Sequence, residues 1–246
     1  MRITKLVSIA DIFTLVNALL GFTAILLALD GRIVYAIYAV LAGILCDGLD
    51  GVVARRFARK WYLGDYLDVM ADTTSFCVAP SVIVFETTKP WAEAAAGLWG
   101  PALLYLACGA TVVCGLLRLA RFCYLSGGHS STFVGLPSPG SALVLCLLAL
   151  QPFFSADPLP PWLAPAAAFV LAALMVSDLR YPKVRGAFAY ASGAAILLVM
   201  LTERLEATRM LSELLLDVAL MLAAAYVALG PFSHRLRSRR TDHGQG

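Results

Sequence analysis

Apolar segments of about the length of a membrane span recur along the whole chain. They cover an N-terminal segment up to residue 29 and then residues 33–50, 66–85, 99–117, 140–153, 162–177, 187–201 and 211–229. A helix needs roughly 20 mostly apolar residues to cross a bilayer; 140–153 and 187–201 are short, so a re-entrant or tilted course is the alternative for them. With 60% hydrophobic and 14% charged residues, the composition does not suit a soluble protein. The sequence predicts an all-α, polytopic membrane helix bundle of about eight transmembrane helices, the first of them retained and not cleaved as a signal peptide.

The distribution of basic residues predicts the orientation of these helices. If eight helices alternate in direction, one side receives Arg2, Lys5, Arg55, Arg56, Arg59, Lys60, Arg118, Arg121, Arg180, Lys183, Arg185, Arg235, Arg237, Arg239 and Arg240, and the other keeps Arg32, Lys89, Arg204 and Arg209. Basic residues accumulate on the cytoplasmic side of membrane proteins. Both termini are therefore expected in the cytoplasm.

No polar block is long enough to form a soluble domain of its own. We therefore expect one transmembrane domain over residues 1–232 and a basic cytoplasmic tail over residues 233–246, SHRLRSRRTDHGQG. Such a tail suits contact with anionic lipid headgroups, and we expect no nucleic-acid partner.

Four aspartates lie at the ends of two neighbouring apolar segments, Asp47 and Asp50 at the end of the first and Asp68 and Asp72 at the start of the second. On helices, the i,i+3 and i,i+4 spacings place each pair on one face. If the basic link RRFARK turns the chain back, the two pairs face each other. Ionisable groups at such positions are costly and usually functional.

A cluster of four carboxylates needs cations. Carboxylate oxygens are hard ligands that suit Mg²⁺ or Mn²⁺, and we expect a divalent site with two ions. Small residues at Gly48, Gly51, Ala54 and Gly64 leave room for a ligand to approach the backbone. Arg55 offers a guanidinium suited to phosphate, and together these features indicate a diphosphate substrate.

The complete pattern resembles the signature of the CDP-alcohol phosphatidyltransferases. It reads Asp47-x2-Asp50-Gly51-x2-Ala54-Arg55-x8-Gly64-x3-Asp68-x3-Asp72, with every signature position present. The resemblance implies the fold of that family and a membrane enzyme that uses divalent metal to displace CMP from a CDP-linked lipid. It also implies that Asp47, Asp50 and Asp68 are metal ligands, and that Asp72 deprotonates the incoming hydroxyl and can itself touch a metal. Independently, all three histidines lie outside the motif, so a carboxylate is the available base there.

A second group of residues concerns the acceptor. Arg118 and Arg121 lie i,i+3 in GLLRLARF and suit a phosphate or a carboxylate, although positive-inside anchoring explains them equally well. Further stretches, LDVMADTTSFCVAPS, RLARF, FVGLPSPGSA and MVSDLRYPK, resemble the phosphatidylserine and archaetidylserine synthase branch. That resemblance implies L-serine as the acceptor. Arg118, Arg121, Arg180, Lys183 or Arg185 could then bind its carboxylate.

Other interpretations remain open at this stage. A sister enzyme would use glycerol 3-phosphate or inositol phosphate as acceptor, and a cation transporter would use the aspartates to bind its ion. Asn17 is a polar residue within the first apolar segment. We expect it to form a hydrogen bond to another helix, and the alternative is a position near the nucleotide. Small residues in GAFAYASGAA (186–195) permit a homodimer, which the family resemblance also implies. We expect the protein in the plasma membrane of a prokaryote, with the motif on the cytoplasmic side.

Overall fold

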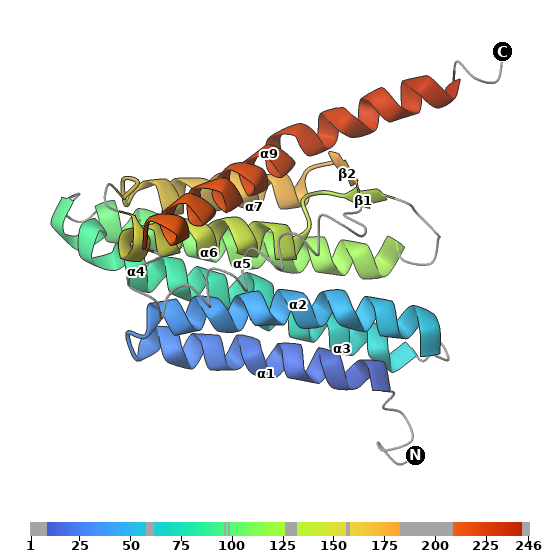
Figure 1. Cartoon of the computed structure of the whole chain (residues 1–246), viewed down its shortest axis with the longest axis horizontal. Helices are drawn as coiled ribbons and strands as arrows, with labels where there is room; N and C mark the ends of the chain where they lie inside the picture. Colours follow the sequence, from blue (N-terminus) through green and yellow to red (C-terminus); the bar gives the residue numbers. More distant parts are fainter. Residues whose placement is uncertain are drawn as a thin grey trace.

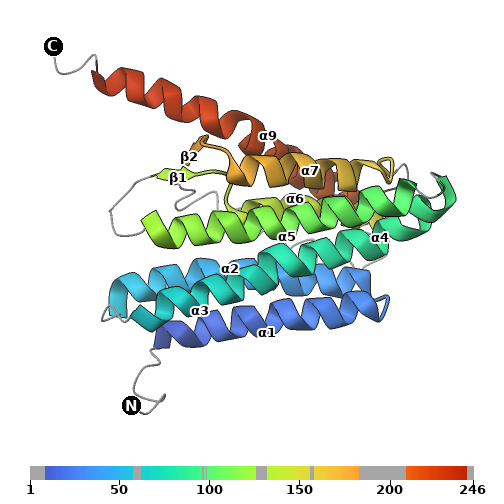
Figure 2. The same cartoon turned by 180° about the vertical axis from the view of Figure 1, so that it is seen from behind.

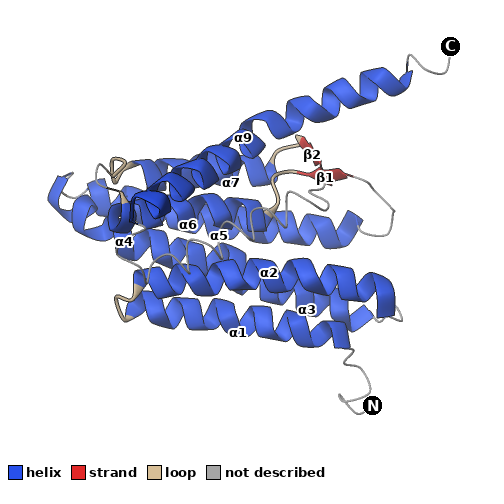
Figure 3. Ribbon diagram, in the orientation of Figure 1, coloured by secondary structure: helices blue, strands red, loops and turns tan. Residues whose placement is uncertain are grey.

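The computed structural model describes residues 9–57, 62–95, 97, 99–125, 132–155, 158–182 and 209–242. These residues form a bundle of long helices with one short two-stranded ribbon (Figures 1 and 3). The elements in chain order are α1 Ile9–Leu29, α2 Ile33–Phe57, α3 Tyr62–Asp72, the π-helix η2 Thr73–Val78, α4 Ala79–Ala95, α5 Trp99–Leu125, β1 Thr132–Val134, α6 Ser138–Phe154, α7 Leu163–Val176, β2 Arg180–Pro182 and α9 Arg209–Asp242.

α1, α2 and α3 run in alternating directions through the bundle (Figure 1), and α4 continues in the direction of α3. A tight turn joins α1 to α2, where Gly31 adopts a φ of 75°, a conformation that glycine reaches without steric cost. α1 begins, α2 ends, α3 begins and α9 ends at the same end of the molecule (Figure 1). We call this end, which holds Asp47 and Asp68, the motif end.

Seven of the eight expected spans correspond to helices, and the eighth, 187–201, lies outside the described residues. Within the described part, four segments are long and apolar enough to cross a membrane: Asp11–Leu29, Tyr66–Ala94, Trp99–Tyr124 and Glu213–Gly230. Ile33–Gly48, Ser138–Phe154 and Leu163–Val176 are apolar but shorter. Many large apolar side chains face outward, among them Leu19, Leu106 and Met221, as expected where lipid surrounds the bundle. The protein is an integral membrane protein with an all-helical membrane domain.

The expected span 66–85 is not one regular helix. It comprises the end of α3, the π-helical segment η2 and the start of α4, which run on continuously (Figure 2). A π-turn holds one extra residue, and such turns occur often at functional sites. Ser75, Phe76 and Cys77 of η2 are buried, so the residues that follow Asp72 turn into the core.

A two-stranded antiparallel ribbon, β1 with β2, caps the bundle at the motif end and was not expected from the sequence. Phe133 pairs with Tyr181 in its register. Tyr181 is fully buried and its hydroxyl donates to the backbone oxygen of Val227 on α9 at 3.2 Å. Burial raises the pKa of this phenol, which keeps the donating proton in place. The ribbon thereby ties the segments after α5 and α7 to the last helix.

Close helix packing in the bundle depends on glycine. A Cβ atom at Gly115 of α5 would collide with Sγ of Cys77 on η2, whereas one at Gly109 of the same helix would meet no atom within 4 Å. Gly115 therefore lets α5 approach the segment that follows Asp72.

The packing of α5 on η2 can be tested by substituting these two glycines. Gly115→Ala is expected to lower the thermal unfolding temperature in detergent, because overpacking a filled site costs about 1–3 kcal/mol. Gly109→Ala is the matched control and should be neutral or stabilising by up to about 1 kcal/mol. Equal unfolding temperatures for the two variants would contradict this packing.

Candidate metal and substrate site

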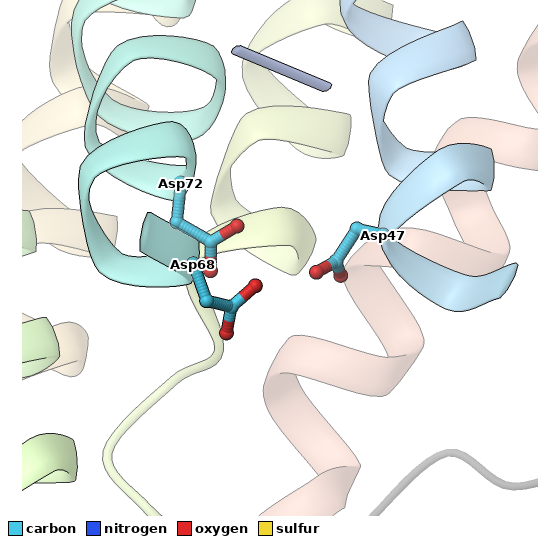
Figure 4. Close-up of side chains that lie close together, drawn as sticks. All are labelled: Asp47, Asp68 and Asp72. Atoms are coloured by element: carbon cyan, nitrogen blue, oxygen red, sulfur yellow. The ribbon is translucent and has the colours of Figure 1, made fainter. Parts of the chain in front are cut away.

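Three of the four predicted aspartates converge at the motif end. Asp47 comes from α2, and Asp68 and Asp72 come from α3; one carboxylate oxygen from each lies within 4.8 Å of the others. Figure 4 shows the carboxylates of the two helices pointing toward the same space. We call these three residues the aspartate cluster. Asp50 lies one turn after Asp47 on α2, but its side chain is outside the described part of the structure.

The helices place these side chains as the spacing predicted. Asp68 and Asp72 are one turn apart on α3 and share a face. α2 and α3 run in opposite directions from the link at residues 58–61 (Figure 1), which brings Asp47 opposite that face. The described helices α2 and α3 are therefore antiparallel, as the prediction requires, while the link itself and the side chain of Asp50 lie outside the described part.

The cluster concentrates negative charge in a poorly solvated place. Asp72 is only 7% exposed, while Asp47 and Asp68 are half-buried. Like charges at this separation repel strongly when water is scarce. Carboxylate oxygens are the ligands that Mg²⁺ and Mn²⁺ prefer, so the donor set and its geometry fit a divalent cation.

Asn17 connects the first helix to the cluster. This residue of α1 is fully buried, and its Nδ2 donates to Oδ1 of Asp72 at 3.4 Å. Its backbone oxygen accepts a hydrogen bond from Ser75 Oγ at 2.8 Å, and a Cβ atom at Gly43 would lie 2.8 Å from its Oδ1. The expected interhelical hydrogen bond is confirmed, and its partner is a residue of the motif.

Arg118 is a buried cation beside the cluster. It lies on α5, is 6% exposed, and its Nη1 donates to Ser138 Oγ at 2.9 Å. Its guanidinium interacts electrostatically with Asp72 and Asp47. An isolated buried charge is very costly, so the aspartates and Arg118 stabilise one another in the apolar bundle.

The other predicted acceptor cations occupy different surroundings. Arg121, one turn after Arg118, pairs with Asp178 at 3.0 Å and donates to the backbone oxygen of Val176 at 3.3 Å. Arg180 is exposed on β2, and Lys183 and Arg185 lie outside the described residues. Of the cations whose side chains are described, Arg118 is therefore the one that the fold brings to the aspartate cluster.

The small residues of the motif also lie in different surroundings. Gly64 faces α1, because a Cβ atom there would lie 3.0 Å from Oδ1 of Asp11, whereas Gly48 faces open space. Gly64 thus allows α3 to pack on α1, a role that spacing alone did not indicate. The side chains of Ala54 and Arg55, and any contact of Gly51, lie outside the described part.

One partner of Arg118 was not identified from the sequence. Ser138 at the start of α6 accepts the hydrogen bond from Arg118, but in the sequence it stands among turn-forming residues. No local pattern distinguished it from an ordinary loop residue.

Comparisons with known proteins agree with the motif. The sequence model of a family described as CDP-alcohol phosphatidyltransferase matches residues 7–177. Archaetidylserine synthase of Methanothermobacter thermautotrophicus is 34% identical over 190 residues, which cover 75% of this chain and 74% of that protein. The CDP-diacylglycerol–serine O-phosphatidyltransferase of Helicobacter pylori strain 26695 is 33% identical over 75% of this chain and 76% of its own length. The enzyme of the same name from Methanocaldococcus jannaschii is 30% identical over 74% of this chain and 77% of its own length.

The aspartate cluster predicts a measurable divalent site. Asp68→Asn is expected to weaken Mn²⁺ binding by more than about ten-fold, because even the loss of a residue that only hydrogen-bonds to a metal ligand has an effect of that size. The affinity is measured by electron paramagnetic resonance titration of the purified protein. Asp30→Asn is the control, because Asp30 is exposed and lies at the opposite end of α1. Unchanged Mn²⁺ affinity in Asp68→Asn would show that the cluster is not a metal site.

Proposed function

Because the chain belongs to the CDP-alcohol phosphatidyltransferase family, we propose that it transfers the phosphatidyl group of a CDP-linked lipid to the hydroxyl group of L-serine and releases CMP. The observation that carries this proposal is the convergence of Asp47, Asp68 and Asp72 beside the buried cation Arg118. The names of the relatives support serine as the acceptor. The lipid donor is CDP-diacylglycerol or its ether counterpart, CDP-archaeol.

The aspartates have two roles in this proposal. Asp47, Asp50, Asp68 and Asp72 hold two divalent cations, Mg²⁺ or Mn²⁺. Held by these residues, divalent cations would supply positive charge against the diphosphate and the leaving CMP. Gly48, Gly51, Ala54 and Arg55 form the side that receives the CDP-lipid, whereas Gly64, also predicted for this side, lets α3 pack on α1.

Asp72 is the proposed base. One carboxylate oxygen of Asp72 takes the proton of the serine hydroxyl, and the serine oxygen forms a bond to the lipid-side phosphorus as the bond from that phosphorus to CMP breaks. The hydrogen bond from Asn17 to Asp72 Oδ1 fixes the orientation of the carboxylate, since a general base must lie within reach of the proton it removes.

Arg118 is the cation best placed for the carboxylate of serine. In serine the hydroxyl oxygen and the carboxylate carbon are separated by only three bonds, so a group that holds the carboxylate must lie near the base. Arg118 interacts with Asp72, whereas Arg121 is paired with Asp178. Arg121, Arg180 and Lys183 are then available for anchoring or for a lipid phosphate.

The cellular setting is part of the same proposal. The protein lies in the plasma membrane of a prokaryote, with both termini and the motif end in the cytoplasm, where CDP-lipid headgroup, serine and metal ions meet. We propose a transmembrane domain over residues 1–232, a basic tail over residues 233–246 and a homodimer. The small-residue segment 186–195, which suggested the dimer, lies outside the described residues.

The activity is tested by CMP release from the purified protein. With Mn²⁺ or Mg²⁺ and CDP-diacylglycerol or CDP-archaeol, release is expected to require L-serine and not glycerol 3-phosphate or inositol phosphate. Asp72→Asn is expected to lower kcat by at least about 100-fold, the contribution of a general base. Release with a different acceptor would overturn the serine assignment, and full activity of Asp72→Asn would overturn the role of the base.

The role of Asn17 has its own test. Asn17→Leu keeps the approximate shape of the side chain but removes the donor to Asp72, and kcat is expected to fall about ten-fold, as for one hydrogen bond to a charged group. Ser75→Ala is the matched control, because it removes a hydrogen bond to the backbone of the same residue and leaves Asp72 untouched. Equal kcat values for the two variants would exclude a role of Asn17 in orienting the base.

A further inference from the structure

The packing of α5 on η2 sets the position of Arg118. Gly115 of α5 faces Cys77 of η2, because a Cβ atom at Gly115 would collide with Sγ of Cys77. α5 runs in the direction opposite to α3, η2 and α4 (Figure 2). Arg118 is one turn after Gly115 on the same face, and one π-helical turn back from Cys77 leads to Asp72. The guanidinium of Arg118 therefore lies beside the aspartate cluster, in agreement with its electrostatic interaction with Asp72.

Ser138 holds this guanidinium by a direct hydrogen bond. Nη1 of Arg118 donates to Oγ of Ser138 at 2.9 Å, and both side chains are buried. Hydrogen bonds from a charged donor are roughly twice as strong as those between neutral groups. Because the guanidinium is planar and carries its N–H donors in a rigid fork, this bond limits the directions in which the other donors of Arg118 can point.

The place of Ser138 in its helix explains why its hydroxyl group is available to a neighbour. Buried hydroxyls within helices, such as those of Ser81 and Thr111, donate to the backbone oxygen four residues earlier. Ser138 is the first residue of α6, so no preceding helical turn offers it such an acceptor. Ser141, one turn later on the same face, is also fully buried, yet its hydroxyl has no hydrogen-bond partner among the described residues. Burial at the start of α6 therefore does not by itself supply a partner, whereas Ser138 has one.

The chain just before Ser138 is fixed on the end of α7. The backbone N–H of Gly135 donates to the backbone oxygen of Leu179 at 2.8 Å. Gly135 has a φ of 80°, and a Cβ atom there would collide with the backbone oxygen of Met175, so this close approach requires glycine. α6 consequently begins at a defined place, and Ser138 is presented to Arg118 by a segment that is bound on both sides.

We propose that Ser138 is a positioning residue of the active site: it orients the guanidinium of Arg118 so that the other N–H donors meet the carboxylate of the acceptor. This inference rests on the proposed function and deepens it, because it assigns the segment from the ribbon to the start of α6 to acceptor binding. A carboxylate accepts two parallel hydrogen bonds from a guanidinium only when the two groups are aligned. Ser138 acts through Arg118, so its loss changes the apparent affinity for the acceptor and not that for the CDP-lipid.

The test compares the two buried serines of α6. Ser138→Ala in the full-length protein is expected to raise the KM for L-serine about ten-fold, as for the loss of one hydrogen bond to a charged group. Its KM for CDP-lipid and its Mn²⁺ affinity should not change. Ser141→Ala is the matched control, because it removes an equally buried hydroxyl that has no partner in the described part of the chain, and its KM for serine should equal that of the wild type. Unfolding temperatures measured in the same detergent establish that both variants are folded.

A double-mutant cycle identifies the route of the effect. Ser138→Ala and Arg118→Lys are expected to be less than additive in their effects on the KM for serine, because both act through one guanidinium. If Arg118→Lys releases no CMP, the comparison of the two serine variants decides alone.

Three results would overturn the inference while leaving the proposed function intact. They are equal KM values for serine in Ser138→Ala and Ser141→Ala, an equal rise of the KM for serine and for CDP-lipid in Ser138→Ala, and full additivity with Arg118→Lys. Wild-type protein that releases CMP only with an acceptor other than serine, or with none, would overturn the proposed function and this inference with it.

Discussion

The site depends on holding several negative charges close together at one end of an apolar bundle. Three carboxylate groups with oxygens within 4.8 Å repel one another strongly where water is scarce, and a fold that contained only these groups would lose stability. The structure supplies compensation from two other helices, an amide donor from Asn17 and the buried guanidinium of Arg118. The remaining negative charge is what makes the site attractive to divalent cations.

Much of this could be predicted because the determining features are local in sequence. Apolar runs of span length specify helices, and seven of the eight runs correspond to helices in the described residues. The spacing between Asp68 and Asp72 specifies a shared helix face. α2 and α3 run antiparallel (Figure 1), which brings Asp47 opposite that face.

The features that could not be predicted depend on contacts between distant segments. Arg118 and Arg121 are one turn apart and look equivalent in sequence, yet the first meets Ser138 and the cluster while the second pairs with Asp178. Their partners come from α6 and from the segment after α7, and no local pattern identifies them. The π-helical segment and the β-ribbon are similar cases, because each satisfies packing around neighbours that are remote in the chain.

The order of the site residues along the chain has a consequence for biosynthesis. All the motif aspartates are present once residue 72 has been translated, but Arg118 and its partner Ser138 follow later. A nascent chain therefore passes through a stage in which its acidic residues are inserted without their arginine. The acidic part of the centre is therefore made before the cation that stabilises it.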